Sequence, residues 1–129
     1  MTSGDFAAFA AADASEQAIA GHAQMVRTAN GTTKVSIHVT GLAPGAIYGS
    51  HVHAAHCDTS DADGHYSFGF AVGGGAGPGT AEIWPGPVVA NAGGVANGKA
   101  TVDATAGASA VSVVIHRSTG EKIACADLS

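Results

Sequence analysis

The densest group of chemically competent side chains in this sequence lies in HVHAAHCDTSDADGHY, residues 51–66. This segment holds four of the seven histidines, one of the two cysteines and three aspartates. Imidazole is a common ligand for copper, zinc, iron and nickel. The segment therefore predicts metal chemistry, and the first question is which histidines are ligands and what completes the site.

His51 and His53 are two residues apart in a predicted strand, so their side chains project from the same face. That spacing suits chelation of one ion, although an HxH pair alone is a weak signal. His65 follows a loop rich in aspartate and glycine, and by itself it would be interpreted as a surface histidine. The histidines that we expect to lie outside any metal site are His22, His38 and His56.

His116 ends the strand predicted at 109–117. Alternation along this strand places Val113 and Ile115 on the core face. His116 falls on the opposite face together with Val114, so periodicity alone favours a histidine that faces solvent.

The elements that must position these side chains are short strands. TKVSIHVTGL (33–42) alternates cleanly, with Val35, Ile37 and Val39 on one face. Further strands are predicted at 18–28, 46–54 and 122–128, a strand or extended loop at 65–72, a short edge segment at 80–84, a hairpin-like segment at 88–105 and a flexible glycine-rich connection at 73–79. Seven or eight short strands separated by turns favour an all-β sandwich or barrel.

A chain of 129 residues suggests one domain, which we place at 18–129, with 1–17 as either a tail or a first strand. The net charge is −5 with five scattered basic residues, which argues against a nucleic-acid partner. No apolar stretch approaches the ~18 residues of a membrane span. The N-terminus has no basic region and does not resemble a signal peptide.

Cys57 and Cys125 fit either one disulfide or two free thiols. We predict the disulfide, which would close a loop of about 70 residues and stabilise the fold by about 4 kcal/mol in the chain-entropy model. A disulfide in turn predicts an oxidising location.

Several motifs, taken together and in this order, resemble those of a known protein family. They are GSHVHAAHC (49–57), GHY (64–66), VVIHR (113–117) and KIAC (122–125), with TTKVSIHVTGLAPG (32–45) leading into the first. In this combination the chain resembles the Cu/Zn superoxide dismutase family over roughly residues 18–128.

The resemblance implies a Greek-key β-barrel of about eight antiparallel strands. It also implies that Cys57 and Cys125 form the disulfide of the family. The copper ligands that it implies are His51, His53, His65, which matches the histidine that bridges copper and zinc, and His116.

The zinc half of the family's site has no counterpart here. Residues 66–102, where the other zinc ligands should lie, contain no histidine and no aspartate, and Glu82 is their only acidic residue. We therefore expect copper and no zinc. The aspartates before His65 lie on the wrong side of the motif and are interpreted as a solvated turn: Asp58, Asp61 and Asp63.

A second departure follows His116, where the family carries a long charged loop. Here RSTGE (117–121) allows only a tight turn, so a bound copper should be open to solvent. Both losses together are typical of the copper-only, bacterial branch of the family. Some members of that branch are repeated domains of longer chains, and this chain is at most one such unit.

Two further roles are predicted by comparison with the family. Lys122 occupies the position of an arginine that guides the anion, and Arg117 is the other candidate. We favour Lys122, because Arg117 alternates away from the face of His116. Without zinc, Glu82 is expected to hold the far nitrogen of His65 or else to cap an exposed strand.

The resemblance thus implies a copper-dependent superoxide dismutase with superoxide as substrate and an extracytoplasmic location. One alternative is a copper-binding domain without catalysis, which uses the same four ligands for storage or scavenging. Another is a structural β-domain that has lost its site. Retention of all four histidines argues against the last alternative.

Overall fold

The structure is a computed structural model that describes residues 1–72 and 81–129. Within these residues the regular structure is eight strands and two single-turn 3-10 helices, so the all-β prediction is confirmed. The strands are β1 (Thr2–Ala8), β2 (Ala20–Arg27), β3 (Thr33–Thr40), β4 (Ile47–His53), β5 (Val88–Val89), β6 (Ala96–Val102), β7 (Ser112–Arg117) and β8 (Lys122–Asp127). The helical turns are η1 (Ala14–Glu16) and η2 (Ser60–Ala62). The connection predicted at 73–79 lies outside the described residues.

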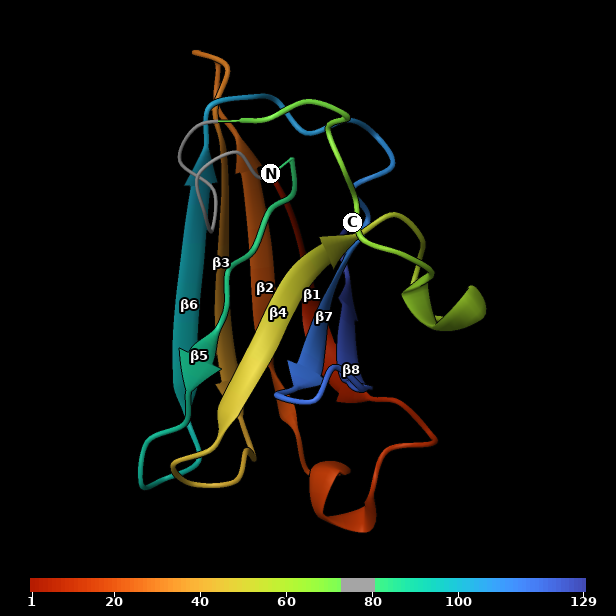
Figure 1. The fold of residues 1–129 in the computed structure, drawn as a ribbon, viewed down its shortest axis with the longest axis vertical. Helices are drawn as coiled ribbons and strands as arrows, with labels where there is room; N and C mark the ends of the chain where they lie inside the picture. The colour runs from red at the N-terminus through yellow and green to blue at the C-terminus, as the bar shows by residue number, and fades with distance from the viewer. Residues whose placement is uncertain (73–80) are drawn as a thin grey trace.

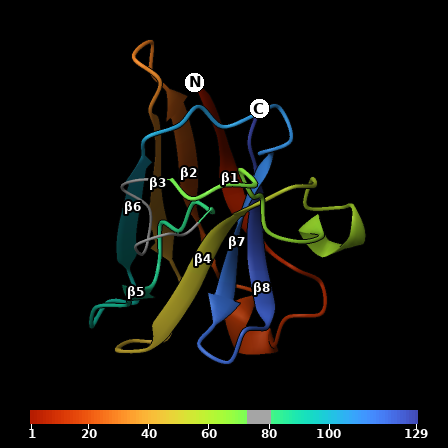
Figure 2. The ribbon, with the colours of Figure 1, turned by 45° about the horizontal axis from the view of Figure 1, so that its top comes forward.

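The strands form one antiparallel sheet that curls into a nearly closed barrel (Figure 1). Their order is β5-β4-β7-β8-β1-β2-β3-β6, and the two end strands β5 and β6 contact each other. Three neighbouring pairs are distant in sequence, namely β1 with β8, β3 with β6 and β4 with β7. Such long crossovers between antiparallel strands make the Greek-key connectivity that was predicted. The β4–β7 pairing is the one that brings separate histidine motifs together (Figure 2).

The core forms as the alternation along β3 predicts. Val35, Ile37 and Val39 are buried, whereas Ser36 and His38 face solvent. Each buried aliphatic side chain of this size contributes about 1.5–3 kcal/mol relative to exposure. This contribution fixes the register of β3, because a slip by one residue would turn all three valine and isoleucine side chains outward.

The alternation predicted for β7 is present, with Val113 and Ile115 in the core, but the face opposite the core is not exposed to solvent. Ser112 and Val114 are fully buried, and His116 is only 5% exposed, although they point away from the barrel core. Val114 packs there with Ala62, from the loop after β4, and with Cys125 of β8. This loop therefore covers Val114, whereas His116 is surrounded by the rings of His51, His53 and His65.

Residues 1–17 were predicted to be either a tail or a first strand, and the structure contains a first strand there, β1. β1 lies between β2 and β8, with Thr2 opposite Met25 and Phe6 opposite Ala126. Phe6 is 4% exposed and belongs to the core. Residues 2–8 are therefore an integral part of the sheet.

One further segment differs from its prediction. The hairpin predicted at 88–105 is wrong, because β5 pairs with β4 whereas β6 pairs with β3. At Gly98 of β6 a Cβ atom would lie 2.3 Å from the carbonyl oxygen of Pro85, so the backbones approach closely there without a ladder. The residues around Ser67 and Glu82 are extended and share an isolated bridge. No helix of the described residues is long and apolar enough to cross a membrane.

Candidate metal centre

Four histidines converge on one face of the β4–β7 pair. One potential ligand atom from each of them lies within 4.8 Å of the others, and among the described residues no other group of three or more potential ligands comes together. The ring centroids of His51 and His65 are 4.1 Å apart, and those of His51 and His116 are 4.7 Å apart. His53 completes the group, with its centroid 4.8 Å from that of His65.

The sheet sets these positions through register. His51 and His53 project from the same side of β4, and Gly49 of β4 is opposite His116 of β7. A register shift between Ile115 and His116 interrupts the β7–β8 ladder. Such a bulge re-aims a side chain at the end of a strand. His65 arrives from the loop and forms an isolated bridge with His53.

Backbone carbonyls fix the tautomers of two of these histidines. Nδ1 of His53 lies 3.1 Å from the carbonyl oxygen of Asp63, and Nδ1 of His116 lies 3.0 Å from that of Gly120. A carbonyl oxygen can only accept, so each Nδ1 carries the hydrogen. In the neutral imidazoles the Nε2 atoms are then left with lone pairs, and these two atoms are 3.3 Å apart. Two lone pairs at this distance repel unless a cation lies close to both.

Burial keeps these imidazoles neutral. Burial, followed by the charges of the neighbouring histidines, lowers the pKa of His51 to about 3. Burial is also the largest cause for His53, whose pKa is lowered to about 4 although the Asp63 carbonyl acts in the opposite direction. Burial also lowers the pKa of His116. Nδ1 of His51 is itself buried and has no hydrogen-bond partner among the described residues. Neutral, converging and unpaired nitrogens are what a transition metal needs, so these residues fit a metal ion.

Glu82 lies where the predicted contact to His65 requires it. Its Oε1 is 2.7 Å from Nδ1 of His65 and also accepts a hydrogen bond from the indole N–H of Trp84 over 2.8 Å. Burial alone would raise the pKa of Glu82, but these two hydrogen bonds outweigh it and lower the pKa. The carboxylate is therefore ionised and accepts from Nδ1, which leaves Nε2 of His65 for a metal. Its effect on a bound metal stays a prediction.

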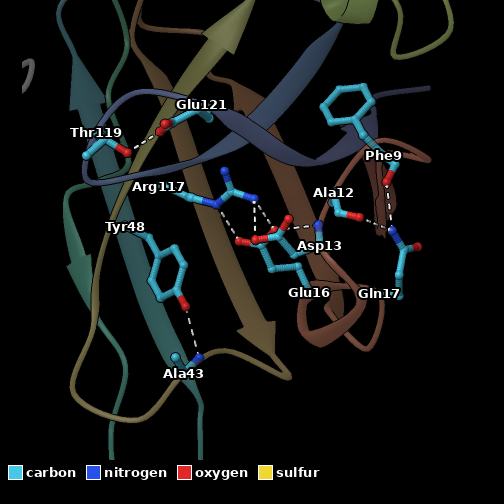
Figure 3. A network of polar contacts seen from close by, with 10 residues as sticks. All are labelled: Phe9, Ala12, Asp13, Glu16, Gln17, Ala43, Tyr48, Arg117, Thr119 and Glu121. Carbon is cyan, nitrogen blue, oxygen red and sulfur yellow. Dashed lines mark hydrogen bonds and ion pairs between the residues drawn. The ribbon is translucent and has the colours of Figure 1, made fainter.

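Arg117 is held away from any role as a free cation. Its guanidinium makes two hydrogen bonds to the Glu16 carboxylate, at 2.7 and 2.5 Å, and lies 3.1 Å from Asp13 (Figure 3). The hydrogen bond to Glu16 is the main cause that raises the pKa of Arg117 above its usual value. Two carboxylates thus compensate this one positive charge, and the contact links β7 to η1.

Lys122 is tied differently. Its Nζ donates to the carbonyl oxygens of Asp61 and Asp63, at 2.7 and 2.6 Å. These acceptors are neutral carbonyls, and the positive charge of Lys122 contributes to lowering the pKa of His53 and of His116. Of the two predicted anion guides, Lys122 is therefore the one that makes no ion pair with a carboxylate in the part of the chain that the structure describes.

An open cavity of about 340 Å³ gives access to the histidines. His51, His65 and His116 form part of its wall, together with Arg117. Lys122 is not part of that wall. The turn at 117–121 is tight, with the Gly120 N–H bonded to the carbonyl of Arg117, and it leaves this side uncovered.

The remaining histidines and the aspartates that precede His65 stay outside the cluster. Nδ1 of His56 lies 3.2 Å from Asp127, that of His38 lies 2.8 Å from Asn97, and that of His22 lies 3.0 Å from Asp5. The side chains of Asp58, Asp61 and Asp63 are exposed, as a solvated turn predicts.

Sequence reasoning missed what the backbone of that turn does. The carbonyl of Asp63 holds His53 and Lys122, and it is presented by a left-handed turn in which four successive residues, Ser60 to Asp63, have positive φ. None of the four is glycine, so composition carries no signal for this conformation. Trp84 was also missed, although its spacing of two from Glu82 would place both on one face of an extended segment.

The predicted disulfide is present between Cys57 and Cys125. It ties the loop after β4 to β8, and the N–H of Cys57 also bonds the Asp127 carboxylate over 2.8 Å. The loop that carries the Asp63 carbonyl is thus anchored by a covalent bond. A disulfide is compatible with an extracellular location.

Comparison with known proteins adds no further identification. No protein-family model matches this chain, and no curated protein matches it. The case for a function is therefore built on the motifs and on the geometry of the four histidines.

Proposed function

We propose that this protein binds one copper ion through His51, His53, His65 and His116 and catalyses the dismutation of superoxide. The observation that carries the proposal is the set of four imidazoles whose ligand atoms lie within 4.8 Å of one another. The carbonyl contacts of His53 and His116 direct Nε2 of both toward the same point. We further propose that the chain belongs to the copper-only branch of the Cu/Zn superoxide dismutase family and works outside the cytoplasm.

Copper is the metal that this donor set favours. Imidazole suits Cu(II), which binds nitrogen sites more tightly than Zn(II) does, and it also accommodates Cu(I). A bound copper that alternates between these states converts two superoxide ions and two protons into O₂ and H₂O₂. No zinc is part of the proposal, because residues 66–102 supply only Glu82 as an acidic or histidine ligand.

The protein's own groups have separate tasks in this scheme. The carbonyls of Asp63 and Gly120 orient His53 and His116, and the Glu82 carboxylate orients His65. Such partners hold a ligand ring in place and raise its basicity. The cavity admits a small anion, and the charge of Lys122 attracts it.

The proposal is tested by reconstitution with copper. We expect one copper and no tightly held zinc per chain when both metals are offered in excess, and a rate of superoxide decay well above that of the same amount of free copper. His116→Ala should lose most of that rate. A second tightly bound zinc would contradict the copper-only assignment, and decay no faster than with free copper would contradict the enzyme.

A copper-binding domain without catalysis is the second candidate, and one observation favours it. Arg117, the cation in the cavity wall, is compensated by Glu16 and Asp13, so the entrance attracts anions only weakly. The chain as a whole carries a net charge of −5, which favours metal cations over superoxide. Stoichiometric copper binding without a superoxide-dependent rate would select this alternative.

A further inference from the structure

The one tryptophan of the sequence lies against the metal centre. The ring of Trp84 meets His51 edge-on, with centroids 4.4 Å apart and planes at 66°. It also faces His65 at 6.4 Å and 87°. Its indole N–H is directed to the Glu82 carboxylate. One side chain thus contacts two of the four histidines and the acid that holds one of them.

The backbone around Trp84 is clamped onto β4. The carbonyl of Ile83 accepts a hydrogen bond from the N–H of Val52 over 3.0 Å, and the Ile83 side chain is fully buried. Farther on, a Cβ atom at Gly86 would lie 2.7 Å from the backbone nitrogen of Ser50, so only glycine allows this approach. Alternate side chains of an extended segment point to opposite sides. Ile83 points into the core, so Trp84 and Glu82 both project away from the core and toward the histidines.

One oxygen of Glu82 accepts from both the histidine and the indole. Oε1 receives Nδ1–H of His65 over 2.7 Å and Nε1–H of Trp84 over 2.8 Å. Two donors that converge on one oxygen define its position more closely than either donor alone. The indole is a rigid donor whose ring is packed beside His51, so it helps to set where Oε1 lies.

We propose that Trp84 is a positioning residue of the metal centre, which fixes the Glu82 carboxylate through its N–H and covers His51 with its ring. This inference rests on the proposed metal site. It goes beyond that site by assigning a role to a residue that is not a ligand but contacts both Glu82 and His51. It assigns two separable tasks, one to the nitrogen and one to the ring. Two substitutions separate them: Trp84→Phe removes the N–H and keeps most of the ring, whereas Trp84→Leu removes both.

The test measures Cu(II) affinity by competition with a chelator, together with the Cu(II) electron paramagnetic resonance spectrum. Trp84→Phe should weaken copper binding roughly three- to tenfold, less than the 10–100-fold typical of a direct partner of a ligand, and should change the copper hyperfine splitting. In a Glu82→Ala background the same substitution should have no further effect, because its acceptor is gone. Trp84→Leu should in addition lose copper to the chelator faster than Trp84→Phe. The matched control is Phe70→Leu, which changes an aromatic side chain that is 61% exposed and lies outside the cluster. This variant should have the copper affinity and the spectrum of the wild-type protein.

The outcomes separate this inference from the function it rests on. A Trp84→Phe protein with the wild-type affinity and spectrum, or an effect that persists in the Glu82→Ala background, would overturn the role of the N–H. Copper loss from Trp84→Leu no faster than from Trp84→Phe would overturn the role of the ring. Copper binding with these effects but without dismutation would refute only the proposed enzyme, and a wild-type protein that binds no copper would refute both.

Discussion

The contact between Glu82 and His65 allows a quantitative prediction about copper affinity. Glu82→Gln keeps an oxygen that can accept from Nδ1 but removes the negative charge. A hydrogen bond to a charged group contributes about 1.5–3 kcal/mol, roughly twice as much as a neutral one. The His65 and Glu82 side chains are 33% and 30% exposed, so solvent screens part of this interaction. We therefore expect the substitution to remove about 1–1.5 kcal/mol of copper binding energy, which is roughly a five- to twelvefold weaker affinity.

The fluorescence of Trp84 offers a direct assay. It is the only tryptophan of the chain, and its ring centroid is 4.4 Å from that of His51, so Cu(II) bound to the histidines should quench its emission. Titration with copper in the presence of a competing chelator then gives the affinity for wild type and for Glu82→Gln. The pH profile of superoxide decay, measured on the same proteins, should shift as well.

The matched control is Asp5→Asn. It makes the same change of charge in another histidine–carboxylate pair, in which Asp5 lies 3.0 Å from Nδ1 of His22, outside the cluster. We expect copper affinity to remain at the wild-type value in this variant. If Glu82→Gln leaves both the affinity and the pH profile as they are in wild type, or if Asp5→Asn changes them equally, the positioning role of Glu82 is refuted.

Three further outcomes are expected. The free energy of unfolding of the metal-free protein should fall as the pH drops from about 6.5 toward 4, by at most ~1.4 kcal/mol per pH unit for each of His51 and His53. The reason is that the two histidines take up protons in the unfolded chain but not in the folded site. Urea unfolding at pH 7 and pH 5 measures this difference, and equal stabilities would contradict it. Replacement of both Cys57 and Cys125 by serine should lower the free energy of unfolding by about 4 kcal/mol, since the bridge spans 68 residues of sequence, and denaturant titration checks it. Lys122→Gln should slow superoxide decay by the copper-loaded protein and weaken its dependence on ionic strength, whereas an unchanged salt dependence would exclude this lysine as the anion guide.

Much of the fold and of the candidate site could be predicted from local patterns. The alternation in β3 identifies its buried face, because side chains of a strand alternate and apolar burial selects one register. The HxH spacing places His51 and His53 on one face for the same reason. The burial of His116 could not be predicted in this way, since the histidine rings that surround it come from a distant part of the chain.

The sequence by itself determined which side chains are available: four histidines in short motifs, two cysteines that can pair, and Glu82 as the single acidic residue of 66–102. The tertiary structure alone decided how they are used. It brings His116 beside β4, pairs the Arg117 guanidinium with Glu16, and sets the tautomers of His53 and His116. The physical reason is that those tautomers depend on backbone carbonyls, which every residue carries. Only the path of the chain, and no pattern of residue types, places a particular carbonyl next to a particular ring.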